Sequence, residues 1–174
     1  LPFVWTPQEQ FFLDHSTNDQ VIPYLLYRFK FHVLPERRTV TDFPVHLLVE
    51  PISVCNLRCV MCFQTDSSFT KKPFMGLMDF GLYKDVIDQA VEGGAGALSL
   101  GSRGEPFLHP NLGKMLRYAS DKKAFFDLKI NTNATKLTEA QCHDVLSSDV
   151  NLIALSIDAH EKALYEDIRV RGNF

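Results

Sequence analysis

The sequence lacks the features of a membrane, secreted or nucleic-acid-binding protein. No apolar run approaches the roughly 20 residues that a transmembrane helix needs, and no charged-then-apolar leader is visible at its start. Its 18 Lys and Arg residues stand against 21 Asp and Glu residues, a net charge of −3, so there is no basic excess to bind a phosphate backbone. We therefore expect a cytoplasmic protein that binds neither nucleic acid nor membrane.

Cysteine is scarce, and its placement argues against disulfides. Of the four cysteines, Cys55, Cys59 and Cys62 fall within eight residues, while Cys142 lies 80 residues beyond the last of them. Secreted disulfide scaffolds are small and spread their cysteines along the chain. Three bunched thiols in a reducing compartment favour metal chemistry over three incidental core cysteines.

The remaining composition is that of a globular protein. With 45% hydrophobic and 22% charged residues, disordered, collagen-like and coiled-coil classes are excluded. A chain of 174 residues buries about 70% of its extended surface, enough for one core. The chain starts at Leu1 rather than Met and stops at Phe174 directly after a helix-like stretch, so we expect a piece of a longer protein.

The hydrophobic pattern divides the chain into two parts. Residues 1–44 form a predicted N-terminal extension, with short helices over 8–15 and 21–33 that Pro23 breaks and Pro35 ends. From residue 45 onward, strands and helices alternate. We expect strands at 45–49, 97–100, 126–130 and 152–157, and helices at 79–92, from 112, from 138 and from 164.

Repeated βα units predict an α/β fold with a parallel sheet and helices outside it, closed either as an open doubly wound sheet or as a barrel. In both, function collects at the carboxyl ends of the strands. One predicted helix explains Cys142. Thr138 and Gln141 form a capping box, and Leu137 and Cys142 occupy the two staple positions around it, so core packing is preferred over a role as a fourth metal ligand.

The first predicted strand is followed by Cys55, Cys59 and Cys62 in the spacing Cys-x3-Cys-x2-Cys. A structural zinc site wants four ligands, usually in paired Cys-x2-Cys units, and there is no second pair. Iron–sulfur clusters use closely spaced thiolates, and three thiolates leave one iron of a four-iron cluster without a protein ligand. An open position favours catalysis, while a non-catalytic iron–sulfur electron-transfer module remains the alternative.

This motif resembles the signature of the radical S-adenosylmethionine (radical SAM) enzymes. The resemblance implies that Cys55, Cys59 and Cys62 hold a [4Fe-4S] cluster and that S-adenosylmethionine binds its unique iron. It further implies reductive cleavage to a 5′-deoxyadenosyl radical, which abstracts hydrogen from a substrate. The position before the third cysteine, usually aromatic and packed near the adenine, is Met61, which is apolar and polarizable enough to serve.

A second segment is similar to the family's Gly-Gly-Glu-Pro motif. Gly104, Glu105 and Pro106 match it, and Arg103 replaces the first glycine. The resemblance implies that the backbone and the glutamate receive the ammonium group of S-adenosylmethionine. A carboxylate suits a cation, and glycine lets the backbone approach closely.

Two further strand ends look like family segments. Asn133 follows the third predicted strand, and the alanine after it, Ala134, predicts either a turn without positive φ or positive φ at Asn133. Ser156 and Asp158 end the fourth strand on one side of it, where both reach ribose hydroxyls or the ligand carboxylate. Near the end of the chain, Arg169 and Arg171 either meet that carboxylate or belong to a solvated helix end.

The resemblance covers residues 45–174, the predicted core domain, and is closest to SPASM-type members. It implies a partial (β/α) barrel with about four of six βα units, truncated at its C-terminus. The implied partners are a small-molecule or peptide substrate and a reductant such as flavodoxin or ferredoxin. No catalytic side chain is assigned beyond the cluster, and an inactive fragment is a further alternative.

Overall fold

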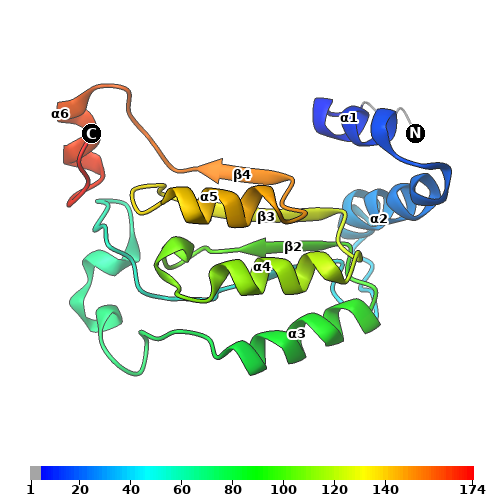
Figure 1. The fold of residues 1–174 in the computed structure, drawn as a ribbon, viewed down its shortest axis with the longest axis horizontal. Helices are drawn as coiled ribbons and strands as arrows, with labels where there is room; N and C mark the ends of the chain where they lie inside the picture. Colours follow the sequence, from blue (N-terminus) through cyan, green and yellow to red (C-terminus); the bar gives the residue numbers. More distant parts are fainter. Residues whose placement is uncertain (1–4) are drawn as a thin grey trace.

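The computed structural model describes residues 5–174; residues 1–4 of the predicted N-terminal extension lie outside the described part. Four parallel strands form one sheet in the order β1-β2-β3-β4 (Figure 1). They are β1 (His46–Val49), β2 (Ala97–Leu100), β3 (Asp127–Thr132) and β4 (Leu152–Leu155). Neighbours in the sequence are neighbours in the sheet, as short crossovers require.

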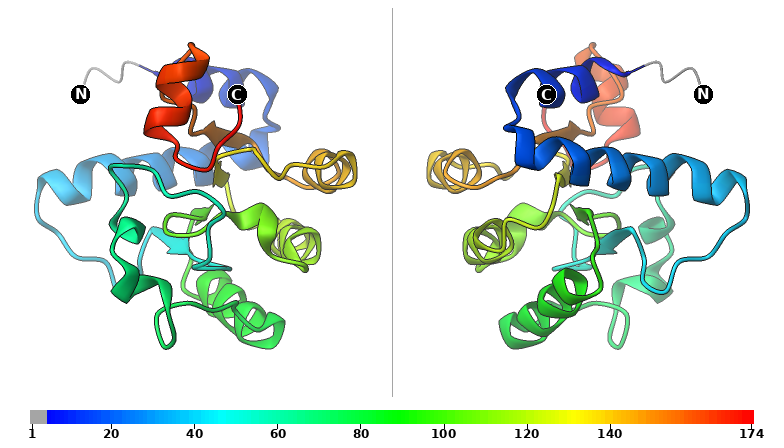
Figure 2. Two further views of the ribbon diagram at one scale, coloured as in Figure 1. Left: turned by 90° about the vertical axis from the view of Figure 1, so that its left-hand side faces the viewer. Right: turned by 90° about the vertical axis from the view of Figure 1, so that its right-hand side faces the viewer.

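Three helices connect these strands: α3 (Phe80–Glu92), α4 (Leu112–Asp121) and α5 (Glu139–Leu146). Figure 2 shows them side by side on one face of the sheet. The core lies between this layer and the sheet, where Leu98, Leu100, Met115, Leu116 and Ile130 are fully buried. The chain therefore has the predicted α/β fold, a partial barrel of four parallel strands.

Helix α3 begins and ends where its sequence offers capping residues. The Asp79 carboxylate accepts hydrogen bonds from the backbone N–H groups of the first turn, and Gly93 is the C-cap. Tyr83 and Ile87 are fully buried in the core, and Val86 and Val91 pack against it, while Leu82 is 54% exposed.

Two helices precede the sheet, α1 (Pro7–His15) and α2 (Asn18–Glu36). The predicted break at Pro23 is wrong, because α2 runs through Pro23 without interruption. It starts earlier than expected, at a capping box formed by Thr17 and Gln20, so the hydrogen bond that Pro23 cannot donate falls close to the start of the helix. Pro35 also lies inside α2, one residue before its end.

Helix α2 closes the amino ends of the strands, where Figure 1 places it. Tyr24 and Tyr27 are almost fully buried and pack against Phe126, which precedes β3; Tyr27 stacks on its ring and Tyr24 meets it edge to face. The Tyr27 ring occupies the space that a side chain at Gly96 would need, since a Cβ there would lie 2.3 Å from the ring. Within residues 5–174, no helix has both the length and the apolar character to cross a membrane.

Candidate functional site

The loops that leave the carboxyl ends of the strands surround one cavity of about 350 Å³. All four strands contribute, which is the arrangement expected of a parallel sheet with its function at this end. The lining residues are Cys55, Cys59, Met61, Cys62, Gly101, Ser102, Arg103, Gly104, Glu105, Asn131, Thr132, Asn133, Ser156, Asp158 and Arg169. The sequence motifs therefore meet in space.

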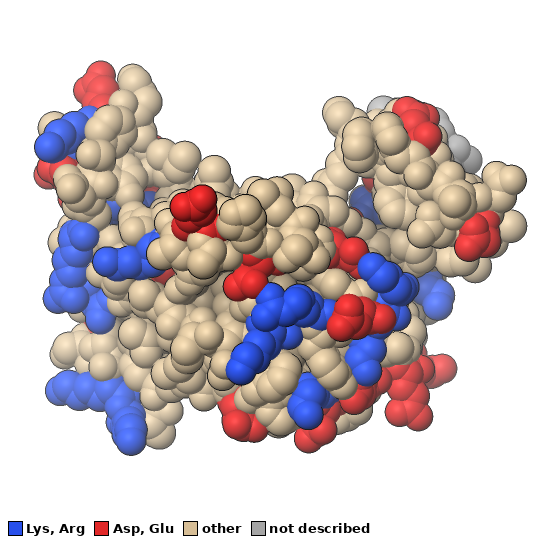
Figure 3. Space-filling view, viewed as in Figure 1, with Lys and Arg blue, Asp and Glu red and all other residues tan. Residues whose placement is uncertain are grey.

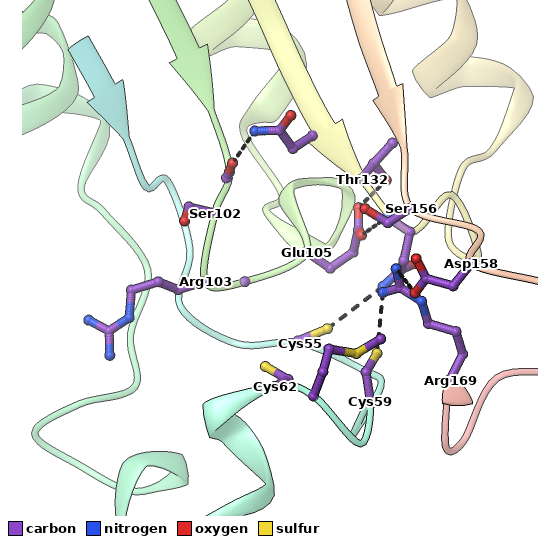
Figure 4. A pocket seen from close by; sticks show the side chains of 15 residues that line it. Cys55, Cys59, Cys62, Ser102, Arg103, Glu105, Thr132, Ser156, Asp158 and Arg169 are labelled. Atoms are coloured by element: carbon purple, nitrogen blue, oxygen red, sulfur yellow. Dashed lines mark hydrogen bonds and ion pairs between the residues drawn. The ribbon is translucent and has the colours of Figure 1, made fainter. Parts of the chain in front are cut away.

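The three cysteines of the loop after β1 gather their sulfur atoms at the same side of this cavity (Figure 4). Local backbone turns hold two of them: the N–H of Leu57 donates to Cys55 Sγ at 3.4 Å, and the N–H of Gln64 donates to Cys62 Sγ at 3.5 Å. Burial raises the pKa of the Cys55 thiol. Burial therefore disfavours the thiolate form of Cys55, and binding of a metal would favour it.

The donor set is of the kind that holds an iron–sulfur cluster, whose irons are bound by cysteine thiolates. All four cysteines are free, and three of them line the cavity. In a [4Fe-4S] cluster each thiolate binds a different iron.

Arg169 reaches the third sulfur from the far end of the chain. It follows α6 (Lys162–Ile168), and its Nη1 donates to Cys59 Sγ at 3.3 Å while Nη2 pairs with the Asp158 carboxylate. Its side chain is only 12% exposed. Burial alone lowers the pKa of Arg169, but Cys59 and Asp158 raise it above its usual value. The alternative of a solvated helix end is wrong for Arg169.

The backbone beside Arg169 is tied to the cysteine loop. The N–H of Arg58 donates to the Val170 carbonyl at 2.9 Å, and the N–H of Val60 donates to the Ile168 carbonyl at 3.0 Å. These bonds bracket Cys59 and hold the end of α6 against the loop. Arg171, the other arginine considered for the ligand carboxylate, does not line the cavity.

Gly104 allows the loop after β2 to touch the chain after β1. A Cβ on Gly104 would lie 2.0 Å from the Ile52 carbonyl oxygen, and the next residue, Glu105, donates its N–H to the Val54 carbonyl at 2.9 Å. Pro106 is buried and begins the short turn η3 (Pro106–Leu108), but it is not among the residues that line the cavity.

The Glu105 carboxylate is 1% exposed and joins two strand ends. It accepts hydrogen bonds from Thr132 Oγ1 at 2.6 Å and from the Asn133 N–H at 2.7 Å, both at the end of β3, and from the Phe107 N–H at 3.1 Å. An ionised carboxylate has about four acceptor positions, so three donors leave one.

Asn133 touches the cysteine loop as well as lining the cavity. Its Nδ2 lies 3.7 Å from Cys55 Sγ and 3.2 Å from Asn56 Oδ1. The expected turn geometry is wrong, because Ala134 itself has a φ of 60°. Its N–H donates to Thr132 Oγ1 at 2.9 Å, and this local bond holds an alanine in the region that glycine normally occupies.

Ser156 and Asp158 both line the cavity, but not from one extended strand. Strand β4 ends at Leu155, and Asp158 has a φ of 66°, so the chain has already turned at that residue. The ion pair with Arg169 is what fixes the Asp158 carboxylate at the cavity wall.

Gln64 helps to hold the cysteine loop in place, although no sequence motif indicated it. It is 2% exposed, and its Nε2 donates to the Ser53 carbonyl at 2.9 Å and to the Arg103 carbonyl at 2.6 Å. It therefore fastens the cysteine loop to the segments after β1 and β2. A polar residue two positions after the last cysteine was the only signal available.

The two remaining sulfur-containing candidates differ. Met61 lines the cavity and is 60% exposed. Cys142 lies in α5, outside the cavity lining, and the predicted capping box of Thr138 and Gln141 is present. The geometry thus leaves Cys142 out of the cysteine group.

Comparison with known proteins agrees with this geometry. The profile of the Radical SAM superfamily matches residues 49–174. A tungsten-containing aldehyde ferredoxin oxidoreductase cofactor-modifying protein of Pyrococcus furiosus is 34% identical over 65% of this chain. The match spans 30% of that protein's length.

Solved structures show the same fold. SuiB of Streptococcus suis, bound to its precursor peptide SuiA, superposes with a TM-score of 0.62 at 20% identity, covering 81% of this chain and 30% of SuiB. The protein anSMEcpe with bound S-adenosylmethionine superposes with a TM-score of 0.57 at 25% identity, covering 72% of this chain and 35% of anSMEcpe. With the family profile matching well over half of its length, the chain belongs to the radical SAM superfamily.

Proposed function

We propose that this chain binds a [4Fe-4S] cluster through Cys55, Cys59 and Cys62, binds S-adenosylmethionine in the adjoining cavity, and cleaves it reductively. The observation that carries the proposal is that three free thiols and the polar groups of the other strand ends line one cavity. Its volume of about 350 Å³ falls in the range of small-molecule sites. The family membership of the chain supports the same conclusion.

Cys55, Cys59 and Cys62 would hold the cluster, which would supply one electron for the cleavage of S-adenosylmethionine to methionine and a 5′-deoxyadenosyl radical, the species that would take hydrogen from a substrate. The chain's own residues ligate, orient and shield. Cys59 is 7% exposed and the neighbouring Leu57 is 2% exposed, so this part of the loop excludes water. The N–H groups directed at the three sulfurs stabilise their negative charge.

The ligand contacts follow from the charges that line the cavity. Glu105 has one acceptor position left after its three hydrogen bonds, and we assign it, with the backbone at Gly104, to the ligand's ammonium group. Ser156 and Asp158 are assigned to the ribose hydroxyls or the ligand carboxylate, Asn133 to the same ligand from the end of β3, and Met61 to the adenine.

The complete reaction includes two partners. A small molecule or a peptide is the proposed substrate, and flavodoxin or ferredoxin is the proposed electron source. The hydrogen acceptor is the radical itself, so no side-chain acid or base is assigned to the cleavage.

The test is anaerobic reconstitution of the chain with iron and sulfide, followed by dithionite and S-adenosylmethionine, with 5′-deoxyadenosine measured by liquid chromatography and mass spectrometry. We expect 5′-deoxyadenosine and methionine in equal amounts. A stable cluster that yields neither product would identify a non-catalytic iron–sulfur module and overturn the proposal.

A further inference from the structure

Beyond Cys62, the cysteine loop continues into a largely exposed segment that does not line the cavity. Between Cys62 and Met78 the secondary structure consists of two short turns, η1 (Phe63–Thr65) and η2 (Ser67–Thr70), and a single bridge between Leu77 and Ile52. Loops of this length without helices or strands are uncommon in compact domains and usually have a function. This segment starts directly after the last cysteine of the motif.

The segment exposes a row of aromatic rings. Phe63, Phe69 and Phe74 are 38%, 38% and 49% exposed. Their rings contact each other edge to face, with centroids 5.8 Å apart for the first pair and 5.7 Å apart for the second. Clustered exposed apolar side chains of this kind mark interaction sites more often than scattered ones do.

Three basic side chains lie beside these rings. Lys71 and Lys72 are exposed between the second and third ring, and the Arg103 guanidinium lies 4.9 Å from the centroid of the first. Arg103 Nε also lies 3.8 Å from the Glu50 carboxylate, so the net positive charge comes from the two lysines. Between Val60 and Met78 there is one acidic residue, Asp66, and its carboxylate caps η2 by accepting the Ser68 N–H at 2.8 Å. At the lower left of Figure 3, over this segment, the visible face shows basic side chains without acidic ones.

We call this surface the Phe–Lys patch; it consists of Phe63, Phe69, Phe74, Lys71, Lys72 and Arg103. The patch lies beside the thiols; of its six residues, Arg103 also lines the cavity, while the three phenylalanines and two lysines do not. Phe63 directly follows Cys62 in the sequence, while Figure 4 shows the Arg103 side chain pointing away from the three sulfurs. A partner seated on the patch would approach Cys62 without entering the space assigned to S-adenosylmethionine.

We propose that the Phe–Lys patch is the docking surface for a small acidic electron-transfer protein. This inference rests on the proposed function and names where its reductant binds. The chain as a whole is acidic, with a net charge of −3, so an acidic partner is attracted to this local surface and not to the molecule in general. Electron-transfer encounters bury little area, so a few aromatic rings with basic neighbours suffice.

The step that docking serves is a one-electron transfer. The carrier is oxidised by one electron and the cluster held by Cys55, Cys59 and Cys62 is reduced by one electron. No covalent bond forms or breaks in this chain, and no proton is taken up by its residues.

The test uses flavodoxin as the probe and the double variant Lys71→Glu with Lys72→Glu. The matched control is Lys30→Glu with Lys114→Glu, which changes the same charge at exposed lysines on α2 and α4. Two quantities are measured at low and high salt: the affinity of oxidised flavodoxin for the reconstituted chain, and the rate at which flavodoxin hydroquinone bleaches the cluster absorbance. Dithionite, which needs no docking surface, is the parallel reductant.

We expect the Lys71/Lys72 variant to bind flavodoxin and accept its electrons at least about tenfold more weakly at low salt, with the difference shrinking as salt is added. Reduction by dithionite and the control variant should stay within about twofold of the unmodified chain. An equal loss in the control, no loss at all, or a change in self-association instead of flavodoxin binding would overturn the proposal. Failure of dithionite to support S-adenosylmethionine cleavage in the unmodified chain would instead overturn the proposed function.

Discussion

The two ends of the parallel sheet differ sharply although the same four strands form both. At the amino end, Tyr24 and Tyr27 of α2 fill the space with buried rings, and Gly96 leaves room for one of them. At the carboxyl end, Gly104 lets two loops touch, and the groups that remain are thiols and polar side chains around a cavity. The strands and their core position both ends, while the loops at one end carry the chemistry.

Charge is handled differently at the two ends. At the amino end, Arg28 pairs with Glu9 and lies 3.4 Å from Asp127, which also accepts the Tyr27 hydroxyl at 2.5 Å. These groups pair with one another within the protein, and the buried Nε of Arg28 is left without a hydrogen-bond partner. At the carboxyl end, Glu105 keeps an acceptor position free, which is what a ligand site requires.

The largest expected effect is loss of the cluster, and it should distinguish the three cysteines at the carboxyl end of the sheet from Cys142. Replacing Cys55, Cys59 or Cys62 singly by Ser should abolish cluster assembly, because a hydroxyl is a poor substitute for a thiolate ligand of iron. Iron and sulfide content after anaerobic reconstitution is the measurement. Cys142→Ser is the matched control and should keep the full cluster. Loss of the cluster in that variant would make Cys142 a fourth ligand.

The next effect is a loss of stability at the amino end of the sheet, which α2 covers. Tyr27→Ala removes a 5%-exposed ring and should lower the free energy of unfolding by about 3–5 kcal/mol, measured by urea denaturation. Phe11→Ala removes a ring that is 64% exposed and should change it by less than about 0.5 kcal/mol. Folded Tyr27→Ala protein should still assemble the cluster. A specific loss of the cluster there would contradict the separation of the two ends.

A smaller effect is expected from the glycine that brings the loops together. Gly104→Ala places a methyl group 2.0 Å from a backbone oxygen, and the strain should cost about 1–3 kcal/mol of the free energy of unfolding. Gly76→Ala meets nothing within 4 Å and should be nearly neutral. Equal unfolding curves for the two variants would show that the loop contact at Gly104 is dispensable.

The smallest effect is a pH dependence of the free energy of unfolding, caused by Glu9 at the amino end of the sheet. Burial raises the pKa of Glu9, but hydrogen bonds from Thr6 and the charge of Arg28 outweigh it, so the pKa is lower than the usual 4.5. This carboxylate therefore stabilises the fold above pH 4.5, and the contribution is lost as the pH falls through its lowered value. Urea denaturation at pH 7 and at acid pH measures the free energy of unfolding. Between the two pH values this free energy should decrease less for Glu9→Gln than for the unmodified chain. An identical decrease would show that ionisation of Glu9 does not contribute to the stability of the fold.

The sequence predicted the frame of the molecule well because its signals are local. The helix over 79–92 and the capping box at Thr138 depend on residues a few positions apart, and the structure has both. The end of each strand was also marked by an unusual cluster, so the meeting of the motifs at one cavity followed from the parallel sheet.

What the sequence missed depends on contacts between distant segments. Gln64 bonds to carbonyls 11 and 39 residues away, so no spacing rule indicates it. Arg169 was a candidate for the ligand carboxylate, but its bond to the Cys59 sulfur, 110 residues away, was not predicted. Pro23 was misread because packing of Tyr24 and Tyr27 favours a continuous α2 over the local preference of proline. The positive φ of Ala134 likewise depends on Thr132, which a residue type alone does not reveal.

The central claim is that the three thiols and the strand ends form a single site in which a cluster and S-adenosylmethionine meet. Electron paramagnetic resonance of the dithionite-reduced, reconstituted chain tests it most directly. The account predicts that adding S-adenosylmethionine shifts the g-values of the cluster, because one iron without a protein ligand is open to the bound molecule. A spectrum that S-adenosylmethionine leaves unchanged, at concentrations that saturate binding, would contradict it.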